Sequence, residues 1–386
     1  MQNTAKRSAS HVYDYVVVGS GLSGLIMARA LNRITDNVLL LEAQDEFGGL
    51  NHSVGWQNQE IPNGLRFLPD TELARRGLQF LQVVSGQTMQ ILSLDCAPLT
   101  FETGSLRPFV GFGENPPAFY DELAYFLAPQ RLQMDRSPAQ WIRDLAEGYT
   151  GDFQSRAYVT KYMAAEARLE SVMINGQRSL RGQNFVHAGR VQDLQVLLPD
   201  SVLNARARQR LTKAKYWTAI CLDLVHSEVV SDSLHTHLLN GTTDDEMGPC
   251  VGQFLVPTAS ATAPQISQWV SFVDHEDAQE SENIANTLKK MKRQIKRASP
   301  QAMEKIAFER ILIAPSIGGN GGLQLTGHQT LAGLENFWLS SSALHQQKNL
   351  LGCLLQAELV CSAMACHPDE SLARPLVDAE VEISAL

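Results

Sequence analysis

The spacing of hydrophobic residues predicts a strand, a tight turn and a helix at the start of the chain. Residues 12–18 are mostly apolar and rich in valine, and this run ends at Gly19. From residue 22 to residue 31 the apolar positions are three and four apart, which is typical of a helix packed on a core. A second apolar run, residues 37–41, predicts another strand that ends at Glu42.

The turn after the first strand has the glycine spacing of a dinucleotide-binding site. Gly19 permits the tight turn, Gly21 lets the backbone approach a pyrophosphate, and Gly24 allows the helix to pack closely on the strand. The N-terminus of the helix offers free N–H groups to phosphate oxygens. Glu42 lies where a carboxylate accepts hydrogen bonds from the adenosine ribose hydroxyls. Together these features predict a Rossmann-type site.

Hydrophobic periodicity predicts further elements along the rest of the chain. Helices are expected over residues 72–84, 274–297 and 349–364. Strands are expected within residues 158–174, 183–198, 213–226, 253–273 and 336–339, with one of them at 194–198 and a hairpin turn at Asn175-Gly176. We therefore expect an α/β fold in which a Rossmann-like nucleotide-binding domain is interleaved with a smaller α+β substrate domain.

Composition narrows the class of protein. A chain of 386 residues with 44% hydrophobic residues can form two or three compact units. The formal net charge of -9 argues against nucleic acid or an anionic membrane as the main partner. Neither a run of about 18 apolar residues nor a signal-peptide core is present, so we expect no membrane-spanning segment and a cytoplasmic protein. The six cysteines are scattered, and no metal site is expected.

A second glycine pair, Gly48-Gly49, follows Glu42-Ala43 closely. This order of motifs resembles the beginning of the amine oxidase, protoporphyrinogen oxidase and phytoene desaturase group of flavoproteins, to which UDP-galactopyranose mutase is related. The resemblance implies FAD as the cofactor, with the Gly-Gly backbone along its diphosphate and ribityl chain. Residues 55–67 resemble the family's hairpin and the turn beneath the flavin, with Pro62 in place of an aspartate and Arg66 in place of a histidine.

The resemblance extends to the end of the chain. Residues 336–339 would be a strand, and the helix that begins at Asn349 would meet the diphosphate and the flavin. Between them, Ser340-Ser341-Ser342 replaces the family's Ala-Gly-Asp turn. The hydroxyl of Ser342 can still hydrogen-bond to a ribityl chain, but it supplies no charge.

The residues expected to contact FAD follow from these matches. They are Gly19, Gly21, Ser23, Gly24, Glu42, Ala43, Gly49, Leu50, Asn51, Leu65, Arg66, Ser342, Leu350 and Leu351. Arg66 has two interpretations: it stabilises negative charge near N1 of the flavin or binds an anionic substrate, or it is an ordinary surface residue of a turn.

The same matches divide the chain into alternating segments. Two segments, 11–75 and 299–366, are expected to bind FAD, and 156–212 would add a β-meander and a strand to the same domain. The substrate domain is expected to consist of residues 76–155 and 213–298, and residues 367–386 would form a tail.

The sequence identifies no catalytic residue, and no lysine can be assigned to the water-holding position of the amine oxidases. The resemblance favours an FAD-dependent oxidoreductase that dehydrogenates a C–N or C–C bond of a small organic substrate by hydride transfer to flavin N5, with oxygen or another electron acceptor. One alternative is a flavin-dependent sugar mutase. Another is a flavin-fold protein without catalysis that serves a protein partner, because Pro62, Arg66 and Ser340 to Ser342 replace family residues.

Overall fold

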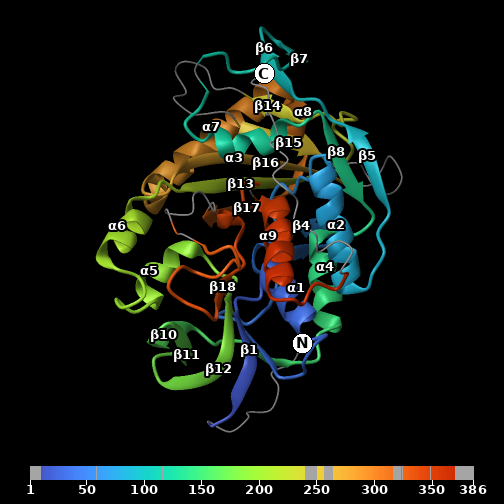
Figure 1. Ribbon diagram of the computed structural model, residues 1–386. Helices are drawn as coiled ribbons and strands as arrows, with labels where there is room; N and C mark the ends of the chain where they lie inside the picture. The colour runs from blue at the N-terminus through green and yellow to red at the C-terminus, as the bar shows by residue number, and fades with distance from the viewer. Residues whose placement is uncertain are drawn as a thin grey trace.

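Two β-sheets form the framework of the molecule. The computed structural model describes residues 10–57, 59–114, 116–239, 250–255, 264–315, 323, 325–347 and 349–369, so most of the expected tail lies outside the described residues. One sheet lies in the lower half of Figure 1 and contains strands from both segments expected to bind the nucleotide. The other sheet lies in the upper half, beneath α7 and α8. Helix α9 runs between the two halves.

The lower sheet joins seven strands of the described chain in the order β10-β11-β12-β1-β2-β9, with β18 also paired to β12. Its parallel part consists of β18, β12, β1, β2 and β9, whereas β10, β11 and β12 form an antiparallel meander. The strands are β1 (Val12–Val18), β2 (Val38–Leu41), β9 (Asp152–Gln154), β10 (Val159–Ala165), β11 (Arg168–Ile174), β12 (Arg178–His187) and β18 (Phe337–Leu339). All of β2 and the last three residues of β1 are buried on both faces, as expected for parallel strands.

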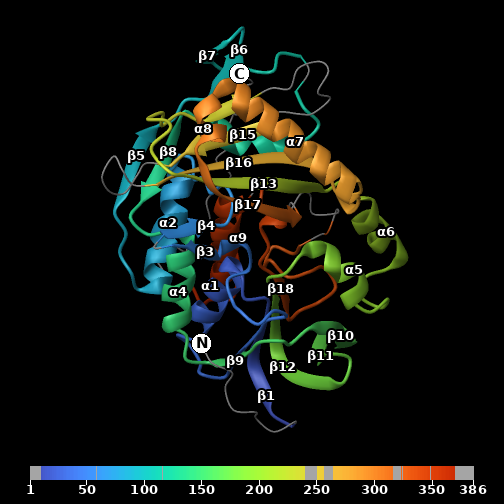
Figure 2. The same ribbon diagram turned by 180° about the vertical axis from the view of Figure 1, so that it is seen from behind.

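Four helices cover one face of this sheet (Figure 2). They are α1 (Leu22–Leu31), α2 (Glu72–Ser85), α4 (Pro138–Glu147) and α9 (Asn349–Ala363). Helix α9 packs on α1 and α2, and a Cβ at Gly77 of α2 would lie only 3.2 Å from the side chain of Leu354. The opposite face is covered by α5 (Leu194–Leu197), α6 (Ala205–Lys213) and apolar residues between 323 and 344. The sheet is thus enclosed on both sides.

The upper sheet joins seven described strands in the order β17-β13-β16-β15-β14-β6-β7. They are β6 (Leu99–Glu102), β7 (Ser105–Pro108), β13 (Trp217–His226), β14 (His237–Leu239), β15 (Cys250–Phe254), β16 (Gln265–Asp274) and β17 (Ile306–Pro315). The long helix α7 (Ser281–Ala298), followed by α8 (Pro300–Glu304), packs on one face through Met291 and Ile295. The short helix α3 (Tyr120–Ala124) covers the other face.

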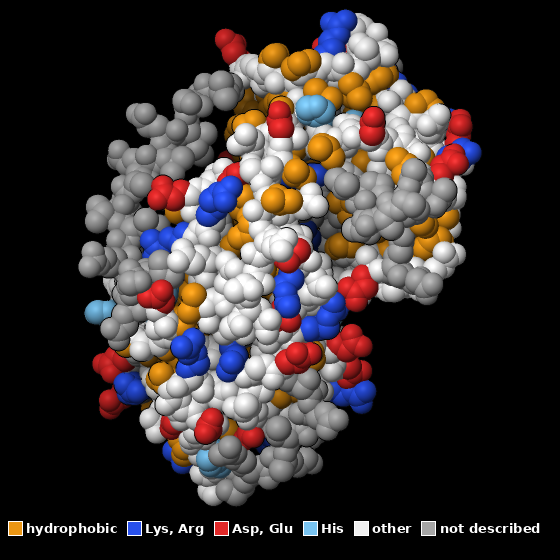
Figure 3. Space-filling view, turned by 90° about the vertical axis from the view of Figure 1, so that its right-hand side faces the viewer, with side chains coloured by type: hydrophobic (Ala, Val, Ile, Leu, Met, Phe, Trp, Pro, Cys, Tyr) orange, Lys and Arg blue, Asp and Glu red, His pale blue; other side chains and the backbone are white. Residues whose placement is uncertain are grey.

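Two small antiparallel ribbons connect the sheets. One is the hairpin of β3 (Ser53–Trp56) and β4 (Gln59–Pro62), and the other pairs β5 (Ile91–Asp95) with β8 (Gln130–Met134). The face of the molecule in Figure 3 carries most of its hydrophobic side chains in the upper part and most of its charged ones in the lower part. Among the described residues, no helix is both long and apolar enough to cross a bilayer.

A buried ion pair attaches the turn after β4 to the upper sheet. Arg310 of β17 donates to Asp223 of β13 at 2.9 Å, and the Asp223 side chain is fully buried. Asp223 also accepts hydrogen bonds from the backbone of Gly64 at 3.2 Å and from Gln268 at 3.0 Å. Arg310 and Gln268 both donate to the carbonyl of Pro62. Residues 62–64 are therefore fixed to three adjacent strands.

The structure corrects three expectations. Residues 194–197 form helix α5, not a strand, because a short apolar run fits either structure and the buried Leu194 and Leu197 lie three positions apart. The helix expected from residue 274 begins at Ser281, after a short turn at residues 277–279. Strand β17, inside the segment 299–366 expected in the nucleotide-binding domain, pairs with β13 of the upper sheet.

Gly24→Ala is expected to lower the free energy of unfolding by about 1–3 kcal/mol, the usual cost of overpacking. A Cβ at this position would lie 1.8 Å from the carbonyl oxygen of Gly19, so α1 would have to move away from the turn. Gly55→Ala is the matched control, because a Cβ at Gly55 meets nothing within 4 Å. Urea unfolding without added FAD measures both variants, and equal stabilities would contradict the close packing of α1.

Arg310→Met is expected to destabilise the protein by about 3 kcal/mol, because it leaves the buried Asp223 carboxylate without its counter-charge. The double variant Asp223→Asn/Arg310→Met should recover most of that loss, since the amide oxygen introduced at position 223 would still accept from Gly64. Lys292→Met, which breaks the partly exposed pair with Glu309 in the same sheet region, should cost less than about 1 kcal/mol. Urea unfolding measures the stability of all three variants. A double variant as unstable as Arg310→Met alone would contradict the view that the loss comes from an unpaired Asp223 charge.

Candidate functional site

The first candidate contact is the glycine-rich turn between β1 and α1. Gly19 has a φ of +97°, which glycine adopts without strain, and the close approach of Gly24 brings α1 against the turn. An added Cβ at Gly21 would meet nothing within 4 Å. Gly21 is the N-cap of α1 and has no side chain to cap the first N–H groups. The turn thus presents open space and uncapped backbone donors together.

Glu42 is held rigidly at the carboxyl end of β2. One carboxylate oxygen accepts hydrogen bonds from the backbone N–H of Ser20 at 2.9 Å and from its hydroxyl at 2.6 Å. The other accepts from the backbone N–H of Gln44 at 2.9 Å. A carboxylate has about four acceptor positions, so this arrangement leaves capacity for one further donor such as a ribose hydroxyl.

The second glycine pair lies directly against the first turn. Gly48 donates its N–H to the carbonyl of Ser20 at 2.8 Å and forms an isolated bridge with Gly21. A Cβ added at Gly49 would lie 3.2 Å from the Cα of Gly21. The two glycine motifs, far apart in the sequence, therefore border the same space. Leu50 then accepts a hydrogen bond from Arg66 through its carbonyl at 2.5 Å.

Arg66 lies where the nucleotide-binding segment meets the upper sheet. It is half-buried as a residue, and desolvation of its guanidinium group lowers its pKa below the usual value. Electrostatic interactions with Cys221, Tyr125 and Asp223 oppose this shift. The hydroxyl oxygen of Tyr125 is buried with no hydrogen-bond partner in the described structure. The surroundings of Arg66 therefore include a buried hydroxyl group without a hydrogen-bond partner.

The end of the chain brings Ser342 and α9 to the same region. The hydroxyl of Ser23 in α1 donates to the carbonyl of Cys353 in α9 at 3.5 Å. Burial raises the pKa of the Cys353 thiol, and the hydroxyls of Ser23 and Ser342 oppose that rise, so both lie near the thiol. Ser340 is fully buried, and its hydroxyl has no partner in the described structure. The beginnings of two helices and this serine turn meet at one place.

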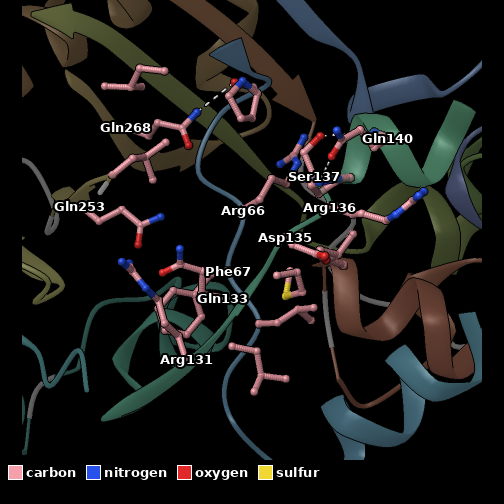
Figure 4. Close-up of a pocket in the computed structure, with 18 of the residues that line it drawn as sticks. Arg66, Phe67, Arg131, Gln133, Asp135, Arg136, Ser137, Gln140, Gln253 and Gln268 are labelled. Carbon is pink, nitrogen blue, oxygen red and sulfur yellow. Dashed lines mark hydrogen bonds between the residues drawn. The ribbon is translucent and has the colours of Figure 1, made fainter. Parts of the chain in front are cut away.

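A cavity of about 490 Å³ adjoins this region (Figure 4). Arg66 and Leu350, both expected near the flavin, line it together with Pro62 and Phe67. Its remaining walls come from β8, the loop into α4, β15 and β16. The volume is within the range of small-molecule sites.

The other expected contacts differ in where their side chains lie. Leu65 and Leu351 are buried in hydrophobic clusters, so their side chains serve the core. Ala43 is exposed, and Asn51 ends a single turn of 3-10 helix, residues Gly49–Asn51. The part of the chain that the structure describes contains no group of three or more side chains arranged to hold a metal ion.

Sequence reasoning missed the polar groups that the upper sheet contributes. Asp223 interrupts the apolar run of β13, and Arg310 interrupts that of β17. Arg131 of β8 lines the cavity and is also buried. A charged residue inside an apolar strand is the sequence feature that could have identified these groups. The residues that such a charge contacts follow only from the pairing of the strands.

Comparison with known proteins agrees with this arrangement. Residues 17–81 match a family model described as an NAD(P)-binding Rossmann-like domain. A flavin-containing amine oxidase A from Sus scrofa is 32% identical over 118 residues, which cover 30% of this chain and 22% of that enzyme. The chain thus matches less than a quarter of that relative's length.

Solved structures resemble the whole fold. Cyclohexylamine oxidase from Brevibacterium oxydans IH-35A has a TM-score of 0.65 at 15% identity and covers 94% of this chain and 100% of its own. A putative protoporphyrinogen oxidase from Exiguobacterium sp. 255-15 also has a TM-score of 0.65, at 12% identity, with 92% of this chain and 99% of its own covered. Residues 17–81 of the chain therefore match an NAD(P)-binding Rossmann-like domain, and the fold of the chain is similar to that of a flavin-type amine oxidase structure and a putative protoporphyrinogen oxidase.

Proposed function

We propose that this protein is an FAD-dependent oxidoreductase that dehydrogenates a small organic substrate at a C–N or C–C bond. The observation that carries the proposal is the cavity of about 490 Å³ that begins at Arg66 and Leu350, beside the region where the glycine motifs, the serine turn and α9 meet. A substrate in this cavity would lie next to the ring system of a flavin held by those motifs.

The residues present fit FAD. The backbone at Gly21 and the first N–H groups of α1 would hold the diphosphate, and Glu42 would accept a hydrogen bond from the adenosine ribose. The buried hydroxyl of Ser340, which has no partner in the described structure, and that of Ser342 would serve the ribityl chain. A serine turn without a carboxylate is compatible with binding, because ribityl hydroxyls need neutral partners as much as charged ones.

When bound, FAD supplies the hydride-accepting atom N5. The substrate carbon would give up its hydrogen with the bonding electrons, and a lone pair on the neighbouring nitrogen, or the electrons of a second C–H bond whose proton departs, would form the new double bond. The protein's part is to orient the substrate and to exclude water. Arg66 is suited to hold a negative charge on the substrate or on the flavin, since its guanidinium is desolvated and already fixed by the carbonyl of Leu50.

Gly21→Ala is expected to weaken FAD binding by about tenfold or more, because the methyl group would occupy the space assigned to the diphosphate. The melting temperature without FAD should stay unchanged, since that space holds no protein atom within 4 Å. Titration of the apoprotein with FAD by fluorescence quenching measures the affinity, and Gly55→Ala is again the control. Unaltered FAD affinity in Gly21→Ala would place the diphosphate elsewhere.

Anaerobic mixing of the FAD-loaded protein with amines, amino acids, pyrroles and porphyrinogens should bleach the flavin absorbance for one of these classes, because dehydrogenation leaves the electrons on the flavin. A protein that takes up no FAD would refute the proposal at its first step. Bound FAD that no substrate bleaches would favour the non-catalytic alternative. Conversion of UDP-galactopyranose only after reduction of the flavin would favour the sugar mutase.

A further inference from the structure

One lining residue of the cavity, Arg131, is a buried cation whose charge the described structure leaves unmatched. It is only 7% exposed, although arginine is rarely buried without a partner. Its Nη1 atom has no hydrogen-bond partner, and no described acidic side chain forms an ion pair with it. Burial lowers the pKa of the guanidinium, and the thiol of Cys96 opposes that shift. Such an arrangement is costly unless an anion completes it.

The backbone of Arg131 fixes the position of this cation. Strand β8 pairs with β5, with Arg131 opposite Leu94, and Arg131 also bridges to Pro69. The next residue, Leu132, donates its N–H to the carbonyl of Leu68 at 2.8 Å. Arg131 thus belongs to a strand that pairs with β5 on one side and with residues 68–69, shortly after Arg66, on the other.

Gln253 of β15 provides a second unused polar group in the same cavity. It is 3% exposed, and its Oε1 atom has no partner in the described structure. Its terminal amide presents a donor or an acceptor, depending on how the group is turned about its last torsion. Figure 4 shows Arg131, Gln133 and Gln253 on one side of the cavity, whereas Arg66 lies nearer to Ser137 and Gln140.

The register of the upper sheet explains why Gln253 is unused. Gln253 is opposite Gln268, Gln268 is opposite Asp223, and Asp223 is opposite Arg310, so four polar residues form one row across β15, β16, β13 and β17. Three members of the row bind one another and the turn at Pro62. Gln253 stands at the end of the row, forms no hydrogen bond to that turn among the described residues, and lines the cavity.

The other charged groups of the lining already have partners. Arg136 pairs with Asp144, and Glu60 pairs with Arg143 at 3.2 Å. Asp135 accepts a hydrogen bond from the backbone of Gln90 at 3.0 Å. No described carboxylate is paired with Arg131, so its positive charge has no counter-charge in this part of the cavity.

We propose that Arg131 and Gln253 form a carboxylate-binding subsite that holds the acid end of an organic ligand whose apolar part extends toward Arg66 and Leu350. The planar fork of arginine matches a carboxylate, and the amide of Gln253 adds a neutral donor beside it. Phe67, Leu132 and Ile266 give the space between the two ends apolar walls. The identification of this ligand as the substrate rests on the proposed function. The ability of the subsite to bind a carboxylate does not depend on that function.

Calorimetric titration of the full chain with octanoate tests the subsite, with octanamide as the uncharged ligand of the same shape. Octanoate should bind about tenfold more tightly than octanamide or better, and Arg131→Gln should abolish that difference, as loss of a charged hydrogen bond predicts. Arg131→Lys should keep part of the preference, because it keeps the charge without the fork. Arg136→Gln is the matched control in the same lining, and its octanoate affinity should stay within about twofold of the wild type, since its charge is already paired.

The melting temperature separates ligand binding from a structural role. Arg131→Gln without ligand should melt no lower than the wild type, because it removes a buried charge that no described residue matches. Equal affinity for octanoate and octanamide, or octanoate binding that is lost in Arg66→Gln but kept in Arg131→Gln, would overturn the subsite. The titrations are done with and without FAD, so a failure to take up FAD would refute the proposed function while still leaving the subsite to be judged by octanoate.

Discussion

The buried contact of Asp223 and Arg310 with residues 62–64 fixes the relation between the two sheets. Removing a carboxylate and a guanidinium from water costs more than their attraction returns unless further hydrogen bonds satisfy them. Here Gly64, Gln268 and Pro62 supply such bonds, yet burial still raises the pKa of Asp223 against the influence of Arg310. Two of the three guanidinium nitrogens of Arg310 stay without a partner in the described structure. The pair therefore serves to hold one turn in one position more than to stabilise the fold.

The position of that turn determines the geometry of the cavity. Because Pro62 and Gly64 are held against β13, β16 and β17, Arg66 two residues later lies between the nucleotide-binding region and the upper sheet. The cavity wall then continues from Arg66 and Phe67 along β8 to Arg131. One polar row in the sheet thus sets both ends of the space, since its inner members hold the turn and its last member, Gln253, lines the cavity.

The local elements at the start of the chain were predictable because their causes are local. Val12–Val18 and Leu22–Leu31 are a strand and a helix with the expected bounds, and Asn175 and Gly176 adopt the positive φ angles of the expected hairpin turn. The prediction of a strand at 194–198 is wrong because a few apolar residues do not distinguish a strand from a helix. The placement of β17 in the upper sheet could not be predicted, because pairing between strands far apart in the chain leaves no recognisable pattern in either strand's sequence.

Adjacent residues specify the dinucleotide turn, the carboxylate at Glu42 and the second glycine pair, because glycine geometry and the order of strand, turn and helix are local properties of the chain. The contribution of the upper sheet to the cavity depends on long-range strand pairing. Asp223, Gln253, Gln268 and Arg310 come from four strands and acquire a common face through register alone. The same holds for Arg131, whose unmatched charge becomes visible only when its surroundings are folded around it and its burial is known.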